Sequence, residues 1–135
     1  MKTEINMVKD FMKKFGQFKV DRPTSEAPIE LRDLRFRLME EELGEWLEAA
    51  LNNDLVEMSD ALMDLLYVTY GTLIAYGISP ECAQEMFAEV QRSNMSKMGV
   101  DGNPLMKNGK VQKGPNFSLP NLKPILEKHG AKFDA

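Results

Sequence analysis

The spacing of apolar residues predicts a chain that is almost entirely helical. Apolar side chains recur every three or four residues, which is the spacing of one face of an α-helix. This pattern holds over four stretches, approximately residues 3–15, 29–51, 54–76 and 80–97. Between these stretches the chain is short, polar and rich in glycine, proline and asparagine, so we expect four helices joined by tight connections.

Local start and stop signals support these helix limits. Ser79-Pro80-Glu81 places a capping residue, a proline and an acid in the order that favours a helix start. Asp54 can cap the third helix, with Glu57 three residues later as the return partner of a capping box. Gly77 is expected to end the third helix, and the fourth is expected to bury Cys82 and Phe87.

The end of the chain predicts a different kind of structure. Asn108-Gly109 is a turn dipeptide that favours a short hairpin over residues 104–113, and three prolines follow it. At most one more short helix is expected, near residues 125–128. We therefore predict one all-α domain over residues 1–135, a bundle of four to five helices with a hairpin-like, irregular tail over residues 98–135.

Acidic residues interrupt the apolar faces of the second and third helices. Leu31, Leu34 and Leu38 share one face, which continues through Glu41 or Glu42 to Glu45. On the third helix Glu57, Asp60 and Asp64 share one face, while Leu55, Leu62, Leu66 and Leu73 occupy the other. Carboxylates that share a partly buried space repel one another, so they protonate or acquire cations. A hard divalent cation with oxygen ligands is the expected partner.

Composition and charge exclude several classes of protein. Of the 135 residues, 43% are hydrophobic and 28% are charged, which is typical of a single soluble domain. Cys82 is the only cysteine, so an internal disulfide and a cysteine-based metal site are excluded. No apolar run reaches membrane-spanning length, and the first residues do not resemble a signal peptide. We expect a cytoplasmic protein with no membrane partner.

The net charge of −4 is unevenly distributed. Residues 26–64 hold twelve acids and three arginines, a net charge of −9, whereas residues 92–113 hold five bases and one acid, a net charge of +4. A nucleic-acid-binding protein would present a continuous basic face, so nucleic acid is not the expected partner. The division instead favours metal ligands on one element and phosphate ligands on another.

The acids are also consistent with other kinds of protein. The acids could form a solvated face of a helical interaction module without enzymatic activity. A ferritin-like di-iron site needs Glu-x-x-His, and the only histidine is His129 in the tail. No glycine-rich phosphate loop is present, and one histidine so placed does not support a Ser-His-Asp site.

The pattern Glu41-Glu42-x-x-Glu45 followed by Glu57-x-x-Asp60 resembles the signature of the all-α nucleoside triphosphate pyrophosphohydrolases, the MazG-like and phosphoribosyl-ATP pyrophosphohydrolase-like group. The similarity extends through Asp60–Gly71 and Arg92-Ser93-Asn94-Met95-Ser96-Lys97, over roughly residues 30–120. The resemblance implies a metal-dependent enzyme that hydrolyses a nucleoside triphosphate between the α- and β-phosphates, giving a monophosphate and pyrophosphate. Phosphoribosyl-ATP hydrolysis is the alternative activity within the group.

The resemblance also implies roles for individual residues. Glu42, Glu45, Glu57 and Asp60 match the ligands of Mg²⁺, for which Mn²⁺ could substitute, and Glu41 is the hypothetical base. Asp64 lies outside the matching motif and is expected to be a further ligand or a contact of the ligands. The cations and amide expected to bind the nucleotide substrate are Arg92, Asn94, Lys97, Lys110 and Lys113. Members of the group are dimers or dimers of dimers, so we expect a homodimer whose chains share a core.

Overall fold

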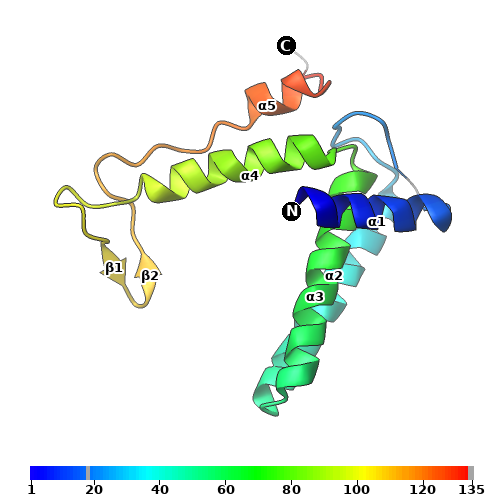
Figure 1. Cartoon of the computed structure of the whole chain (residues 1–135), viewed down its shortest axis with the longest axis horizontal. Helices are drawn as coiled ribbons and strands as arrows, with labels where there is room; N and C mark the ends of the chain where they lie inside the picture. The colour runs from blue at the N-terminus through cyan, green and yellow to red at the C-terminus, as the bar shows by residue number, and fades with distance from the viewer. Residues whose placement is uncertain (18, 134–135) are drawn as a thin grey trace.

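The computed structural model of the chain, described for residues 1–17 and 19–133, confirms the all-α fold (Figure 1). Within the described residues the chain forms five helices and one two-stranded hairpin. The helices are α1 (Lys2–Lys14), α2 (Ile29–Leu51), α3 (Leu55–Ala75), α4 (Pro80–Met95) and α5 (Lys123–Lys128); the strands are β1 (Met106–Lys107) and β2 (Lys110–Val111). The predicted limits of the four long helices agree with the structure to within one or two residues.

The predicted caps form, with one exception. Ser79 Oγ accepts a hydrogen bond from the Cys82 amide at 3.1 Å, at the start of α4. Asp54 Oδ1 accepts one from the Glu57 amide at 3.1 Å, at the start of α3. The return half of the capping box is wrong, because the Asp54 amide donates to the Ala49 carbonyl at 3.0 Å. The Glu57 carboxylate is therefore available for another role.

The tail contains the expected hairpin and one more helix. Met106 pairs with Val111 and Lys107 with Lys110 across the Asn108-Gly109 turn. The tail then runs back along α4 to α5, which begins two residues earlier than expected (Figure 1). The tail is therefore a strap along one helix rather than a separate unit.

The hydrophobic core lies at one end of the α2–α3 pair, where α1 crosses it (Figure 1). Ile5, Val8 and Met12 of α1 are buried against Ile74 and other residues of the pair. The members contributed by other helices include Leu31, Ala75 and Ala83. From this corner the α2–α3 pair extends in one direction and α4 in another, so the molecule has two limbs.

A buried arginine joins α2 to α3 next to this core. Arg35 is only 7% exposed, and its Nε donates to Thr72 Oγ1 at 3.0 Å. Its Nη2 donates to the Val68 carbonyl at 2.9 Å. Burial lowers the pKa of Arg35 from its ordinary value. A Cβ at Gly71 would overlap Arg35 Nη2, so glycine makes the space that the guanidinium occupies.

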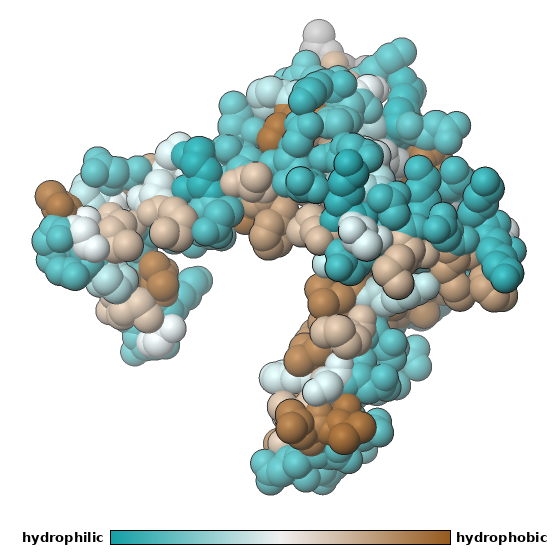
Figure 2. Space-filling model, in the orientation of Figure 1, coloured by the Kyte–Doolittle hydropathy of each residue, from teal (hydrophilic) through white to brown (hydrophobic). Residues whose placement is uncertain are grey.

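Large apolar side chains remain exposed along both limbs (Figure 2). Cys82 is buried as predicted, but Phe87 is 60% exposed, so the prediction that α4 buries it is wrong. Leu62 and Leu66, on the second apolar face of α3, are 42% and 43% exposed. Further exposed residues on the α2–α3 pair are Leu43, Leu47, Leu51, Leu55, Val56 and Met63. Among the described residues, only α3 and α4 taken together, bent by 114°, have the length and composition of a membrane span; no single helix does.

Gly77 is expected to be intolerant of any side chain. Its φ is +80°, and an added Cβ would overlap the Arg22 carbonyl oxygen. Gly77→Ala should therefore lower the free energy of unfolding by at least about 1–3 kcal/mol, measured by urea denaturation. Gly44→Ala is the matched control, because Gly44 lies within α2 with nothing within 4 Å of an added Cβ. The control should raise stability by about 0.5–1 kcal/mol, and equal effects of the two changes would contradict this account.

Candidate metal and phosphate site

An acidic groove lies between α2 and α3, near the turn that joins them. Its volume is about 370 Å³. Three of the four predicted metal ligands, Glu45, Glu57 and Asp60, line it together with Glu48. The other lining residues are Ala49, Asn52 and Asp54. The structure thus brings acids from two helices around one space, although these acids are exposed rather than partly buried.

The local sequence explains why these carboxylates meet. Residues three apart on a helix lie on the same side, so Glu45 and Glu48 extend one row on α2 and Glu57 and Asp60 another on α3. The turn between the helices is fixed by the Asp54 cap and by Asn52 Nδ2, which donates to the Glu48 carbonyl at 3.0 Å. The two rows therefore face the groove from either side.

Glu42 occupies the most restricted position among the predicted ligands. It is half-buried, and within the described residues its Oε2 is buried without a hydrogen-bond partner. Burial raises the pKa of Glu42 to about 7, and the nearby carboxylates of Glu45, Asp64 and Glu41 contribute to the increase. A buried carboxylate oxygen without a donor is costly, and a cation would relieve that cost.

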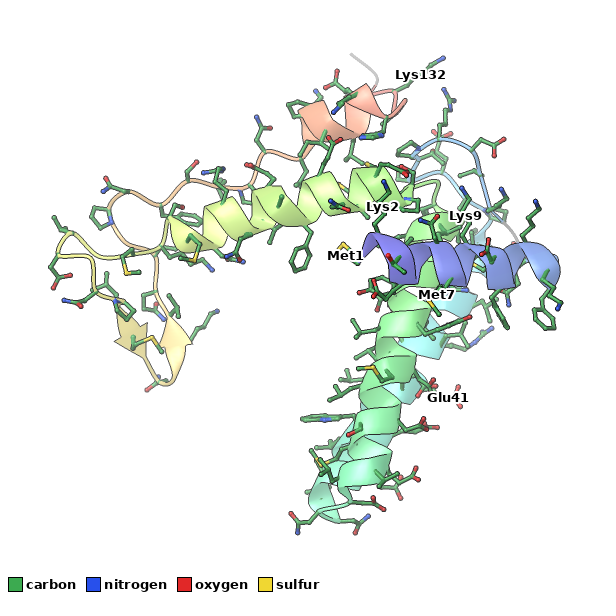
Figure 3. The ribbon with its side chains drawn as sticks, viewed as in Figure 1. Met1, Lys2, Met7, Lys9, Glu41 and Lys132 are labelled. Atoms are coloured by element: carbon green, nitrogen blue, oxygen red, sulfur yellow. The ribbon has the colours of Figure 1, made fainter. Side chains whose placement is uncertain are left out.

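Glu41 and Asp64 are both exposed and lie outside the lining of the groove. Figure 3 shows Glu41 on the α2–α3 limb, on the side away from the β1–β2 hairpin. Their roles as base and as a further ligand remain predictions. Glu48 lines the groove and is missing from the predicted ligand set, although its spacing of three residues from Glu45 could have indicated it.

The groove has the oxygen ligands that a divalent cation needs. Carboxylate oxygens are the ligands that Mg²⁺ and Mn²⁺ prefer, so the residue types fit. Within residues 1–17 and 19–133, however, no three Asp, Glu, His or Cys side chains bring their donor atoms together around one point. The acids surround the groove without forming a coordination sphere, as mutual repulsion between carboxylates favours. The residues therefore fit a divalent cation in the type of their donor atoms and in their placement on facing helices, but not in a preformed coordination sphere.

Two lysines of the basic stretch converge on one aromatic ring. Lys113 Nζ lies 4.9 Å and Lys97 Nζ 6.0 Å from the centroid of the Phe117 ring. The Gly114 amide donates to the Lys97 carbonyl at 2.9 Å, which holds the two segments together. Two ammonium groups near one ring form a local positive charge suited to an anion. Lys110, in β2, is exposed on the adjoining hairpin.

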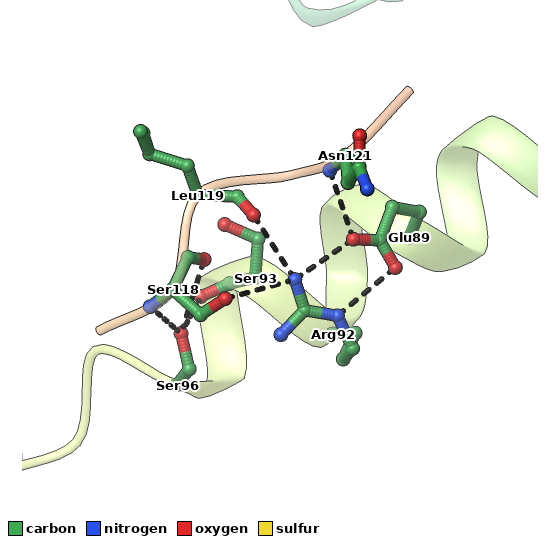
Figure 4. A network of polar contacts seen from close by, with 7 residues as sticks. All are labelled: Glu89, Arg92, Ser93, Ser96, Ser118, Leu119 and Asn121. Atoms are coloured by element: carbon green, nitrogen blue, oxygen red, sulfur yellow. Dashed lines mark hydrogen bonds and ion pairs between the residues drawn. The ribbon is translucent and has the colours of Figure 1, made fainter. Parts of the chain in front are cut away.

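Arg92 fastens the tail to α4 (Figure 4). Its guanidinium donates to both carboxylate oxygens of Glu89, at 2.9 and 2.8 Å, and to the Leu119 carbonyl at 3.1 Å. Glu89 also accepts a hydrogen bond from the Asn121 amide at 3.0 Å. Arg92 therefore has a structural role here. Its predicted contact with phosphate, and that of the exposed Asn94, remain predictions.

The acidic groove and the lysine pair lie on different limbs of the molecule. The groove is near the free end of the α2–α3 pair, whereas the hairpin and the lysines are at the far end of α4 (Figure 1). One chain therefore does not place its own lysines over its own acids.

Comparison with known proteins supports the resemblance. The sequence profile of the family described as phosphoribosyl-ATP pyrophosphohydrolase matches residues 8–94, more than half of the chain. The match includes α2, α3 and nearly all of α4, and it ends before Lys97, Lys110 and Lys113. A search of curated proteins finds no match to the chain.

The Glu89–Arg92 contact generates a prediction about pH. The hydrogen bonds from Arg92 and Asn121 lower the pKa of Glu89 from 4.5 to about 2. A lowered pKa in the folded state contributes stability that is present above pH 4.5 and is lost as the pH falls through about 2. Glu89→Gln should therefore lower the thermal unfolding temperature at pH 7, and the difference from wild type should shrink steadily below pH 4.5.

Glu127→Gln, on α5, is the control for this experiment. Glu127 is exposed, and its side chain takes no part in the network around Arg92. The control should unfold at the temperature of the wild type throughout the pH range. If the unfolding temperatures of Glu89→Gln and wild type differed by the same amount from neutral pH down to the folded-state pKa of Glu89, the ionised Glu89 would not be the source of the stability.

Proposed function

The chain belongs to the phosphoribosyl-ATP pyrophosphohydrolase family, and we propose that it hydrolyses a nucleoside or deoxynucleoside triphosphate between the α- and β-phosphates with the help of Mg²⁺. The products are the monophosphate and pyrophosphate. The family makes the protein a pyrophosphohydrolase of a nucleotide-like substrate. The acidic groove is the observation that supports the metal-dependent reaction. Glu42, one helical turn from Glu45, adds a buried carboxylate oxygen that has no hydrogen-bond partner within the described residues.

In this proposal Glu42, Glu45, Glu57 and Asp60 hold the cation, and Mn²⁺ can replace Mg²⁺. When bound, the cation offsets the negative charge of the triphosphate and lowers the pKa of the attacking water. Glu48 contributes through the same groove, either as a ligand or by orienting one. Asp64, close enough to Glu42 for its charge to raise the pKa of Glu42, is a further ligand or a contact that orients one.

The remaining residues act on the water and on the substrate. Glu41, next to Glu42 on α2, takes the proton of the attacking water as general base. Lys97 and Lys113 hold phosphate oxygens beside the Phe117 ring, and Lys110 adds positive charge on the hairpin. Asn94 and Arg92 contact the nucleotide, with Arg92 also keeping its bonds to the tail.

We also propose that the working enzyme is at least a homodimer. The exposed apolar residues of α3 and α4 form the kind of face that a second chain covers. A second copy can also bring its lysines to the acids that one chain keeps apart from its own lysines. A cytoplasmic location is part of this proposal, because free nucleotides are processed there and the buried Cys82 is a free thiol.

Loss of one proposed metal ligand should abolish the reaction without unfolding the chain. We expect Glu45→Gln and Asp60→Asn each to lower kcat/KM for pyrophosphate release by about 100-fold or more, beyond the roughly 10–100-fold typical of groups that only orient a ligand. Glu40→Gln is the matched control, because Glu40 is exposed on α2 outside the groove. Full activity in either groove variant, with circular dichroism unchanged, would count against the metal assignment.

The substrate can be identified in the same assay. The purified protein is incubated with Mg²⁺ and a panel of nucleoside di- and triphosphates and phosphoribosyl-ATP, and pyrophosphate is scored against orthophosphate. Pyrophosphate from a triphosphate supports the proposal. Activity on phosphoribosyl-ATP alone would replace it with the reaction named in the family description. No pyrophosphate from any compound, with no Mg²⁺ binding detected by calorimetry, would favour a non-enzymatic helical module.

Charged side chains on the exposed face of α3 should dissociate the dimer. We expect light scattering to give a mass of at least two chains for the wild-type protein and of one chain for Leu62→Lys/Leu66→Lys. Lysine is costly to bury at an interface without a partner, and these two leucines are one helical turn apart. Ile29→Lys is the control, because Ile29 is exposed at the first residue of α2, on neither α3 nor α4 and away from the lysine-bearing hairpin. A wild-type protein of one-chain mass would overturn the dimer.

A further inference from the structure

A second cavity in the described part of the chain lies far from the acidic groove. Its volume is about 680 Å³, and its walls come from three segments distant in sequence: the loop before α2, the residues that follow α3, and α5 with the residues after it. The lining includes Arg22, Thr24, Tyr76, Leu126, Lys132 and Phe133. Figure 3 shows Lys132 beyond α5, at the opposite end of the molecule from the free end of the α2–α3 pair.

The cavity and the groove are separated by the length of α3. Glu57 lies in the first turn of α3 and Tyr76 directly follows its last residue. Nineteen residues at about 1.5 Å per residue place them about 28 Å apart. A ligand in the cavity would therefore touch none of the acids of the groove, so the cavity is a separate place on the molecule.

Backbone contacts fix one wall of the cavity. The Thr24 amide donates to the Tyr76 carbonyl at 3.1 Å, which ties the loop to the end of α3. Thr24 Oγ1 in turn accepts a hydrogen bond from the Glu26 amide at 3.0 Å. The absence of a side chain at Gly77 lets the same loop approach the end of α3, because the Arg22 carbonyl oxygen occupies the space that a Cβ would need. This wall is therefore defined by the backbone rather than by adjustable side chains.

A second glycine positions the facing wall without lining it. Gly130, with φ +101°, follows α5, and the Ala131 amide donates back to the Leu126 carbonyl at 2.9 Å. This turn reverses the chain and directs residues 131–133 toward the loop before α2. An added Cβ at Gly130 would lie 3.6 Å from Arg22 Cβ, so the two walls touch there.

The side chains around this space combine two kinds of chemistry. Arg22 and Lys132 are cationic, and within residues 1–17 and 19–133 neither lies within ion-pair distance of a carboxylate. Tyr76, Leu126 and Phe133 add aromatic and aliphatic surface. Lys123 Nζ lies 5.2 Å from the centroid of the Phe133 ring, which adds a third positive charge close by. Among the described residues of the lining, Glu26 is the one acid.

We propose that this cavity binds a small ligand that joins a planar ring to a phosphate or carboxylate group. The volume lies in the range of roughly 300–1,000 Å³ that is typical of small-molecule sites. The ring would lie against Tyr76 and Leu126, and the anion would pair with Arg22 and Lys132, since arginine matches the geometry of both anions. A nucleotide and an aromatic acid share this chemistry.

The test measures binding to the full chain in EDTA, where no divalent cation can hold a nucleotide at the acidic groove. AMP, adenosine and anthranilate are titrated separately into ¹⁵N-labelled protein, and amide shifts are followed by NMR. We expect AMP or anthranilate to shift the amides of Thr24, Tyr76 and Ala131 in a saturable manner. Adenosine, which lacks the anion, should bind at least tenfold more weakly than AMP.

Substitutions then assign the anion contact. Arg22→Gln and Lys132→Gln should each weaken binding at least tenfold, and Arg22→Lys should retain part of it. Lys14→Gln, which removes the same charge from an exposed position at the end of α1 outside the cavity, should leave binding unchanged. Unchanged NMR spectra of the free variants outside the altered site show that each variant is folded.

Three results would overturn the proposal: no saturable shift at millimolar concentrations of either anion, shifts confined to the Lys97–Phe117 region, or equal binding by Arg22→Gln and wild type. AMP binding alone identifies the nucleotide as the ligand class, and anthranilate binding alone the aromatic acid. The result is independent of the proposed function, because it uses no metal and no turnover.

Discussion

Repulsion between carboxylates determines what the α2–α3 pair can do. Among the described residues, Glu42 places a buried oxygen without a partner next to Glu45 and Asp64, and the same two helices continue into a groove with acids on both of its sides. Helices that only needed to pack would not place a carboxylate at the half-buried position of Glu42. The pair keeps its shape because its other end is held by the core, where α1 crosses it. Stability and the charged centre are thus located at opposite ends of one helical hairpin.

Arg35 is a buried charge of the opposite sign at the other end of the α2–α3 pair. It is buried near the core end, seven residues before Glu42 on the same side of α2. Its bonds go to Thr72 and to the Val68 carbonyl rather than to a carboxylate. Arg35 is not among the groups that set the pKa of Glu42, so the arginine does not neutralise the acids. The side that α2 turns to α3 therefore carries a buried cation near one end and crowded anions toward the other.

Much of the fold follows from local sequence signals. The caps at Asp54 and Ser79 and the Asn108-Gly109 turn act within a few residues, so their effect can be predicted without knowing the rest of the chain. The meeting of Glu45, Glu57 and Asp60 also follows, because two helices joined by a short turn must pack antiparallel. The place of Glu48 in the groove is harder to predict, because it depends on how far the groove extends toward the turn. That extent is determined by the packing of α2 on α3.

Burial is harder to predict than secondary structure, because it depends on contacts between elements. Phe87 and the second apolar face of α3 have helical spacing, which indicates that a face is covered but not which chain covers it. The burial of Arg35 is not visible in the sequence either, because the space for its guanidinium is provided by Gly71 on the other helix. Pairing of a large residue with a small one across two helices is not visible in either helix alone.

The two limbs give the exposed apolar faces a physical reason. A chain of this length has little apolar surface to spare for a core, and here the core is confined to the corner where α1 meets the α2–α3 pair. The limbs extend beyond that corner, so each leaves one apolar side uncovered. If a second copy covers these apolar sides, the contact between the two chains would stabilise the assembly. The same contact would bring the lysines of one chain to the acids of the other. Assembly and completion of the site would then be one event rather than two.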